Sequence, residues 1–256
     1  YVEINLKTGL PLESDLDKKI NVKSAGLILT HLYSNSEDII NFHKKYNNKI
    51  PIIEDVAINF GAAINQNKPL GTIFDFGFYS FGTMKNLCTF HGGAIIAKNE
   101  LQLVKIKKNL SQNIDYPVIK SLKLLIFCVL IDILYNKYIY NFFTHYILKL
   151  SIKKLDVLMY PGVYPKFSNK IPRSYQYKFQ SNFAIVGIEN LKTLKFQNIE
   201  RLQKVKLYEK YLNKNLMINN FIYYKANSFL EYPILLKKNN NKFLSKKLLE
   251  IGYDIR

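Results

Sequence analysis

The stretch DFGFYSFGTMKNLCTFHGGA, residues 75–94, decides the fold, because the other apolar segments of the chain can be placed around it. Its first part, residues 76–81, is short, apolar and aromatic, which is typical of a buried β-strand. A polar turn follows, then Lys85, and then a second apolar segment that opens with two glycines. We therefore expect a strand, a loop that carries Lys85, and a second strand.

Lys85 is a candidate for covalent chemistry, although most lysines are only surface charges. A nucleophilic lysine must spend part of its time as a neutral amine, and the unperturbed lysine pKa of about 10.4 prevents this at neutral pH. Burial among apolar groups lowers a lysine pKa. Aromatic residues near Lys85 in the sequence could supply such a setting: Phe74, Phe76, Phe78, Phe81 and Phe90.

A second candidate strand, in the segment IPIIEDVAINFGA, ends at Asp55. If both strands belong to one α/β sheet, Asp55 and Lys85 meet in a crevice at the carboxyl edge of that sheet. A carboxylate opposite a lysine is what pyridoxal phosphate requires, because the acid keeps the ring nitrogen protonated and the lysine binds the cofactor.

The segment EDVAINFGA, followed by Leu70 and Gly71 and then by DFGFYSFGTMKNLCTFHGGAII, resembles the core signature of the DegT/DnrJ/EryC/StrS sugar aminotransferases. The resemblance implies a type I fold enzyme that depends on pyridoxal phosphate. It implies that Asp55 pairs with the pyridine nitrogen, that Ser80 contacts the cofactor phosphate and that Lys85 binds the cofactor covalently. Relatives that dehydrate sugars have histidine at the lysine position, so Lys85 favours transamination.

Three positions depart from the family pattern. Ile58 stands where a glutamine or histidine usually contacts the ring, and it can pack on the ring but cannot hydrogen-bond. Gln176 aligns with an asparagine that reaches the cofactor phosphate of the neighbouring subunit, and its longer stem could make a similar contact. Lys178 replaces an arginine, which loses bidentate recognition of phosphate.

The alternation of strands and helices predicts a parallel sheet covered on both faces. The family resemblance implies a three-layer α/β fold, with a mixed, mostly parallel sheet flanked by helices. Residues 1–170 would form the central and C-terminal part of the large cofactor-binding domain. Residues 171–256 would form an interdomain helix and the start of a small α+β C-terminal domain.

Local patterns predict individual elements. Strands are expected at residues 1–6 and 25–32, and a helix over 36–46 with Ser36 as its N-cap. Residues 61–75 are expected to form a helical turn and loop. A long helix is expected from about residue 175, and a strand, strand and helix over 221–256.

Residues 115–165 form an apolar helical insertion that the family resemblance does not cover well. Its longest apolar run, residues 124–131, is interrupted afterwards by polar residues, which disfavours a membrane span of about 20 residues. Two interpretations stay open: helices packed within the protein or a dimer, and a peripheral contact of residues 121–150 with a membrane surface.

The chain carries 37 Lys and Arg against 19 Asp and Glu, a formal net charge of +18. The basic residues are scattered over the whole length, so we expect a solvated surface rather than a nucleic-acid partner. Such a field would still favour an acidic substrate such as a nucleotide sugar. Two cysteines and four histidines form no disulfide framework or ligand motif, so we expect no metal and a reducing, cytoplasmic setting.

The expected function is transfer of an amino group from an amino acid, with glutamate the expected donor, to a keto group of a nucleotide-linked sugar, in surface polysaccharide or glycan biosynthesis. The resemblance also implies a homodimer and a chain truncated at both ends, so this chain alone is not expected to hold every cofactor contact. The alternative is a non-catalytic or membrane-associated binding protein descended from the same fold, favoured by Ile58, Gln176 and the apolar insertion.

Overall fold

The computed structural model describes residues 1–65, 68–150, 171–213, 227–236 and 241–251. The chain divides into two compact units. Unit 1 consists of Tyr1–Asp115 and Lys178–Leu235, and unit 2 of Tyr116–Tyr177 and Leu236–Arg256. The domain boundary at residue 170 stays a prediction.

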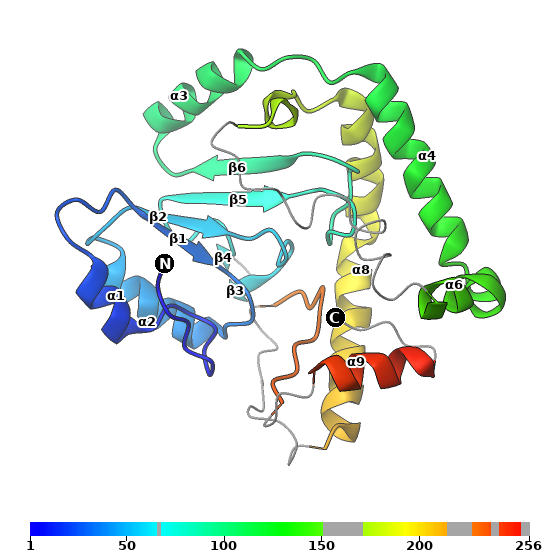
Figure 1. The fold of residues 1–256 in the computed structure, drawn as a ribbon. Coiled ribbons are helices and arrows are strands. Elements are labelled where there is room, and N and C mark those ends of the chain that lie inside the picture. Colours follow the sequence, from blue (N-terminus) through cyan, green and yellow to red (C-terminus); the bar gives the residue numbers. More distant parts are fainter. Residues whose placement is uncertain (66–67, 151–170, 214–226, 237–240, 252–256) are drawn as a thin grey trace. The chain divides into compact units, whose positions relative to one another are not determined.

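Unit 1 is built on a four-stranded sheet in the order β1-β2-β5-β6. The strands are β1 (Leu27–Thr30), β2 (Ile52–Asp55), β5 (Phe76–Ser80) and β6 (Gly93–Ala97). β1, β2 and β5 are parallel, whereas β6 pairs antiparallel with β5. Figure 1 shows these strands side by side. The predicted mixed, mostly parallel sheet is therefore confirmed.

Two short helices at the start of unit 1 pack together, α1 (Glu13–Lys19) and α2 (Ser36–Tyr46). The Tyr46 hydroxyl donates to Asp17 Oδ1 at 2.8 Å, which joins the end of α2 to α1. α2 is amphipathic, and Ile39, Phe42 and Tyr46 recur at helical spacing and enter the core. The helix buries this face because its apolar side chains are removed from water there.

The cap of α2 lies one residue before the predicted position. The Asn35 side chain accepts a hydrogen bond from the Asp38 backbone N–H at 2.8 Å and is the N-cap. Ser36 is instead the first helical residue, and its hydroxyl donates to the Ile64 carbonyl at 3.0 Å. Asparagine and serine are both good caps, so the local sequence did not separate them.

Two other local predictions were wrong. Residues 1–6 form no strand, and only an isolated bridge joins Ile4 to Pro11. Residues 61–75 contain a small antiparallel pair, β3 (Ala63–Asn65) with β4 (Lys68–Pro69), in place of a helical turn.

The described part of unit 1 also contains the helices α3 (Glu100–Ser111) and α8 (Ser181–Tyr211). α8 is the long helix that was expected from about residue 175, and it begins at Ser181. Asn99 caps α3 by accepting from the N–H groups of Leu101 and Gln102. Residues 227–235 were expected to include strands, but they form neither strand nor helix. Residues 221–226 of the same prediction lie outside the described residues.

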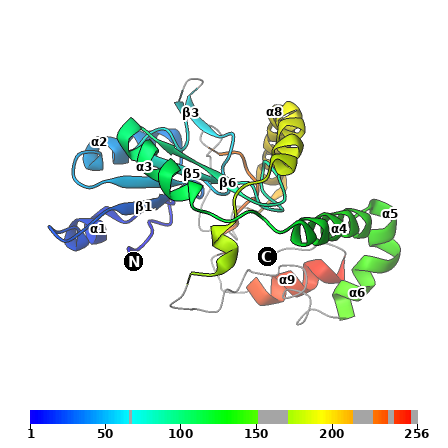
Figure 2. The same ribbon diagram turned by 90° about the horizontal axis from the view of Figure 1, so that it is seen from above.

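Unit 2 is helical in its described part. It contains α4 (Val118–Leu134), α5 (Lys137–Ile139), the π-helix η1 (Tyr140–Thr144), α6 (His145–Leu150), the 3-10 helix η2 (Arg173–Gln176) and α9 (Asn241–Glu250). Figure 2 shows the chain passing from α4 through α5 into α6. Helical elements thus occupy most of residues 118–150, and 151–165 lie outside the described part. That residues 115–165 form an insertion stays a prediction.

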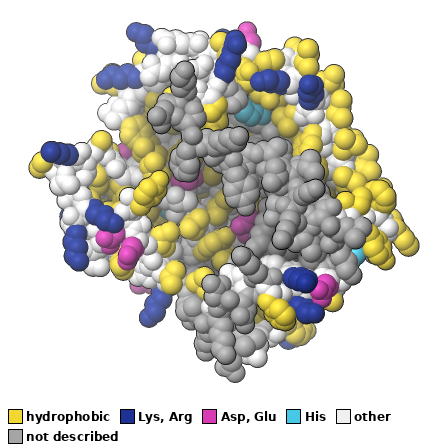
Figure 3. Space-filling model, viewed as in Figure 1, with side chains coloured by type: hydrophobic (Ala, Val, Ile, Leu, Met, Phe, Trp, Pro, Cys, Tyr) yellow, Lys and Arg dark blue, Asp and Glu magenta, His cyan; other side chains and the backbone are white. Residues whose placement is uncertain are grey.

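α4 carries the apolar run 124–131, yet none of its 17 residues is buried. Its exposed hydrophobic side chains, such as Val118 at 78% and Val129 at 50% of full exposure, recur along the helix. Figure 3 shows hydrophobic side chains gathered along the edge where α4 runs. In the described parts of the chain, every helix falls short of the length or apolar character that a membrane span needs.

Candidate active site

Asp55 and Ser80 lie on the same face of the sheet. Asp55 ends β2 and is paired with Phe78 of the neighbouring parallel strand β5. Ser80 is two residues beyond Phe78, so its side chain points to the same face as that of Asp55. Both residues stand at the carboxyl ends of their strands, the edge where ligands bind in open α/β sheets.

Two donors hold the Asp55 carboxylate. The Ala57 backbone N–H donates to Oδ1 at 3.0 Å, and the Thr30 hydroxyl lies 3.5 Å from Oδ2. Thr30 is the register partner of Asp55 on β1. An ionised carboxylate has about four lone-pair sites. The half-buried Asp55 is therefore fixed in direction and retains acceptor capacity for a ligand.

Lys85 lies in the loop that follows β5, residues 81–92, here called the lysine loop. It is half-buried, and its backbone N–H donates to the Gly82 carbonyl at 3.3 Å. The preceding residue, Met84, has a left-handed φ of 67°. Such a backbone is uncommon for a residue other than glycine, and it persists only when the surroundings fix it.

Thr89 and α8 hold the far side of the lysine loop. The Thr89 hydroxyl lies 2.7 Å from the His91 carbonyl, and its backbone N–H donates to the Phe81 carbonyl at 2.8 Å. From α8, the Asn190 side chain donates to the Cys88 carbonyl at 2.7 Å. Gly187 of α8 faces Thr89, where a Cβ would come within 2.7 Å of the Thr89 methyl group. The loop is therefore anchored at both of its ends.

Ile58 is half-buried in the segment after β2, and its carbonyl accepts from Asn86 Nδ2 at 3.4 Å. Its neighbour Asn59 is buried, and its side chain donates to the carbonyls of His31 and Leu32, both at 2.6 Å. The Asn59 side chain therefore binds the backbone that follows β1.

Glu54, next to Asp55, points to the opposite face of the sheet and is fully buried. It accepts the backbone N–H groups of Gly71, Ile73 and Phe74 at 2.6 to 2.8 Å. It also accepts from His31 Nε2 at 2.8 Å. Burial alone would raise the pKa of Glu54, but the bonds from His31 and from the backbone outweigh it, and the pKa is lowered.

Thr30, Glu54 and Asn86 were not predicted from the sequence to take part in this region. A charged residue inside the apolar run IPIIED was the available signal for Glu54, because alternation along a strand assigns it to the buried face. His31, at the end of β1, is a buried structural partner of Glu54.

Gln176 belongs to unit 2. It lies in η2, and its side chain is exposed. Lys178, three residues before α8 in unit 1, is also exposed and forms an ion pair with Asp115 at 3.3 Å.

Residues 1–116 match the model of the DegT/DnrJ/EryC1/StrS aminotransferase family. The family resemblance is confirmed for these residues. They include the segment around Asp55 as well as Ser80 and Lys85, whereas Gln176 lies outside the match.

Two curated relatives come from strains of Campylobacter jejuni subsp. jejuni, and both are named UDP-4-amino-4,6-dideoxy-N-acetyl-beta-L-altrosamine transaminase. They are 26% and 27% identical to this chain over 203 residues, or 78% of it. The chain spans 41% of the length of each.

Solved structures of sugar enzymes share the fold. The sugar aminotransferase CalS13 from Micromonospora echinospora aligns with a TM-score of 0.60 at 16% identity, over 99% of this chain and 58% of CalS13. The E. coli GDP-4-keto-6-deoxy-D-mannose-3-dehydratase with bound hydrated PLP aligns with a TM-score of 0.59 at 17% identity, over 100% of this chain and 58% of the dehydratase. The α/β fold of PLP-dependent sugar aminotransferases is thereby confirmed.

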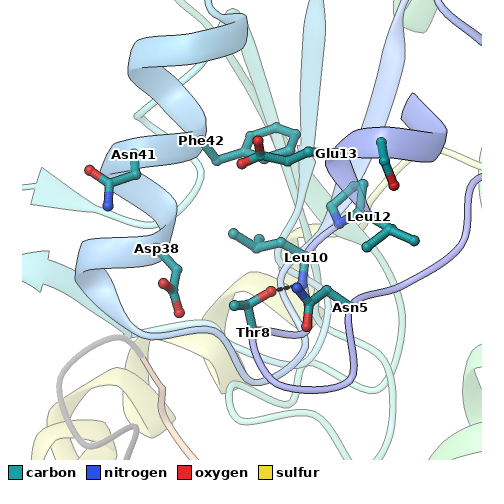
Figure 4. A pocket seen from close by; sticks show the side chains of 10 residues that line it. Asn5, Thr8, Leu10, Leu12, Glu13, Asp38, Asn41 and Phe42 are labelled. Atoms are coloured by element: carbon teal, nitrogen blue, oxygen red, sulfur yellow. Dashed lines mark hydrogen bonds between the residues drawn. The ribbon is translucent and has the colours of Figure 1, made fainter. Parts of the chain in front are cut away.

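A pocket of about 400 Å³ elsewhere in the family-matched region contains none of the predicted site residues. Figure 4 shows its lining side chains from the N-terminal loop, α1 and α2, including Thr8, Glu13 and Asp38. Among the described residues, no cluster of three or more His, Cys, Asp or Glu could hold a metal ion.

Proposed function

We propose that this chain forms part of a pyridoxal-phosphate-dependent aminotransferase that acts on a keto sugar linked to a nucleotide. The observation that carries the proposal is the placement of Asp55 and Ser80 on one sheet face, with Lys85 in the loop directly after Ser80. The family match over residues 1–116 supports it.

The residues present fit pyridoxal phosphate by their chemistry. The cofactor needs an acid for its ring nitrogen, an amine for covalent attachment and donors for its phosphate. Asp55 retains acceptor capacity after its contacts with Ala57 and Thr30, Lys85 supplies the amine and Ser80 a hydroxyl. Ile58 would pack on the ring without a hydrogen bond.

When bound, the cofactor supplies an electron sink for the substrate carbanion. Asp55 would hold the ring nitrogen in its protonated form. Lys85 would bind the cofactor covalently and, once released by the amino donor, would move a proton at the substrate carbon as general base and acid. Ser80 would hold the phosphate.

We further propose glutamate as the amino donor, a role in surface polysaccharide or glycan biosynthesis and a cytoplasmic setting. A homodimer would allow Gln176 of one subunit to contact the cofactor phosphate of the other. The exposure of the Gln176 side chain is compatible with that contact.

Borohydride trapping tests the proposal. Purified protein is incubated with pyridoxal phosphate, reduced and digested, and the labelled peptide is identified by mass. Label on Lys85 that disappears in Lys85→Ala is expected, and Lys98→Ala, which removes another lysine of unit 1, should retain it. Wild-type protein without label on Lys85 would overturn the proposal.

A second candidate function is a peripheral membrane contact through α4. The observation that favours it is the exposed apolar side chains of this helix, with Lys123 on the same helix and Lys137 just beyond its end. Apolar side chains combined with nearby lysines suit the surface of an anionic bilayer.

Vesicle sedimentation tests this second function. Binding to vesicles that contain an anionic lipid should fall when Leu125 and Val129 are both replaced by glutamate. The control, Leu101→Glu, changes an exposed leucine of α3 in unit 1 and should leave binding unchanged. Equal sedimentation of all three proteins would exclude a contact through α4.

A further inference from the structure

A buried cluster of polar side chains lies beside the candidate site, in unit 1. It consists of Asn59, after β2, Asn86, next to Lys85, and Ser228, from the distant segment 227–231. All three side chains are at most 5% exposed. Burying a polar group costs free energy unless the group is hydrogen-bonded. The hydrogen bonds of these three side chains therefore show which segments of the chain the cluster joins.

Asn86 is fixed through its amide nitrogen. Nδ2 donates to the Phe60 carbonyl at 3.1 Å and to the Ser228 hydroxyl, and it lies 3.4 Å from the Ile58 carbonyl. Its oxygen is buried without a hydrogen-bond partner among the described residues. The hydrogen bonds of Nδ2 therefore fix the position of Asn86. Lys85 is the preceding residue in the chain, so its backbone is positioned as well.

Ser228 joins Asn86 to the segment after β2. Its backbone N–H donates to Asn59 Oδ1 at 3.1 Å, and its hydroxyl lies 3.3 Å from the same atom. Asn59 is in turn bound to the backbone that follows β1, and it lies four residues after Asp55. Ser228 thus connects the loop of Lys85 with the strand end of Asp55.

The segment 227–231, here called the strap, is itself held on both sides of Ser228. Asn227 Nδ2 donates to the Ser34 carbonyl at 3.1 Å, and the Tyr33 hydroxyl donates to Glu231 Oε2 at 3.3 Å. Burial, followed by the charge of Glu231, raises the pKa of Tyr33 to about 12. Phe229 is 6% exposed and has a left-handed φ of 47°, so the strap is packed and not loosely attached.

We propose that Ser228 is a positioning residue for Lys85, which it places relative to Asp55 by holding the side chain of Asn86. This inference rests on the proposed function, because it concerns the position of Lys85 as the residue that binds the cofactor. It does not require Ser228 to touch cofactor or substrate.

The test compares Ser228→Ala with the control Ser36→Ala. The control also removes one hydroxyl group that forms a hydrogen bond in unit 1, because the Ser36 hydroxyl donates to the Ile64 carbonyl. Trapping of pyridoxal phosphate on Lys85 should be about tenfold slower in Ser228→Ala, since small misplacements of a reacting group are costly. Ser36→Ala should react at the wild-type rate. In an Asn86→Ala background, Ser228→Ala should add less than about twofold, because residues that act as a unit are not additive.

A second measurement uses the protein without cofactor. Hydrogen exchange of a peptide covering residues 82–92 should be faster in Ser228→Ala than in wild type and unchanged in Ser36→Ala. Wild-type trapping and exchange in Ser228→Ala would overturn the inference. If wild-type protein fails to trap the cofactor, the proposed function fails, and the exchange data alone decide whether Ser228 holds the lysine loop.

Discussion

Glu54 and Asp55 are adjacent in the chain, but their carboxylates have opposite environments. Glu54 is fully buried and bound by three backbone N–H groups and His31, whereas Asp55 is half-buried and has two donors. A carboxylate whose acceptor sites are occupied by the protein serves stability, and one with remaining capacity can serve a ligand. Because successive side chains of a strand point to opposite faces of the sheet, Glu54 enters the core and Asp55 faces the candidate site.

Replacement of Glu54 by glutamine should lower the free energy of unfolding by about 3 kcal/mol, because it removes a charge that buried N–H groups and His31 are arranged to bind. Urea denaturation measures the change. Glu200→Gln, at an exposed position of α8, should stay within about 0.5 kcal/mol of wild type. A similar loss in both variants would contradict a special role for Glu54.

The contribution of Glu54 should also depend on pH. Its pKa in the folded protein is lowered, so the folded state binds this proton less readily than the unfolded state. The stabilisation is therefore complete above the unfolded pKa of about 4.3 and is lost as pH falls through the lower folded pKa. The stability difference between wild type and Glu54→Gln should be large at pH 7 and shrink below about pH 4. A difference that is constant between pH 7 and pH 3 would refute this assignment.

At the scale of elements, local sequence patterns located the strands that carry Asp55 and Ser80, because buried strands and the turns after them have short-range signals. The lysine loop and α8 were also placed correctly. The strap was not placed correctly. It has no regular secondary structure, and its hydrogen bonds to Ser34, Asn59 and Asn86 join it to residues more than a hundred positions away. No local pattern encodes such contacts.

The packing of β5 on the loop before it gives a prediction at this scale. A Cβ on the buried Gly77 would overlap the Gly71 carbonyl oxygen, and backbone atoms cannot move aside as a flexible side chain can. Gly77→Ala should therefore destabilise the protein by about 2 kcal/mol or more, measured by thermal or urea unfolding.

Gly82→Ala is the matched control for Gly77→Ala. Its Cβ would meet nothing closer than Ser80 Oγ at 3.8 Å, so stability should change by less than about 0.5 kcal/mol. If Gly77→Ala proved as stable as Gly82→Ala, the close approach of Gly71 to β5 would be wrong.

At the scale of the whole molecule, the formal net charge of +18 is spread over the sequence and was readable from composition. Composition could not show which binding partner this positive charge attracts. Under the proposed function the positive charge attracts the substrate, because the phosphate groups of a nucleotide-linked sugar are anionic and a basic protein raises their local concentration.

Uridine diphosphate serves as a probe for the nucleotide part of the proposed substrate, and it should bind more weakly as salt increases. Between 0.05 M and 0.5 M sodium chloride we expect its dissociation constant, measured by calorimetry, to rise about tenfold, since the screening length falls well below the size of the protein. Uridine carries no phosphate and should show little salt dependence. If uridine and uridine diphosphate weakened equally, the positive charge would have no part in substrate capture, and recognition would rest on the contacts of the base and sugar.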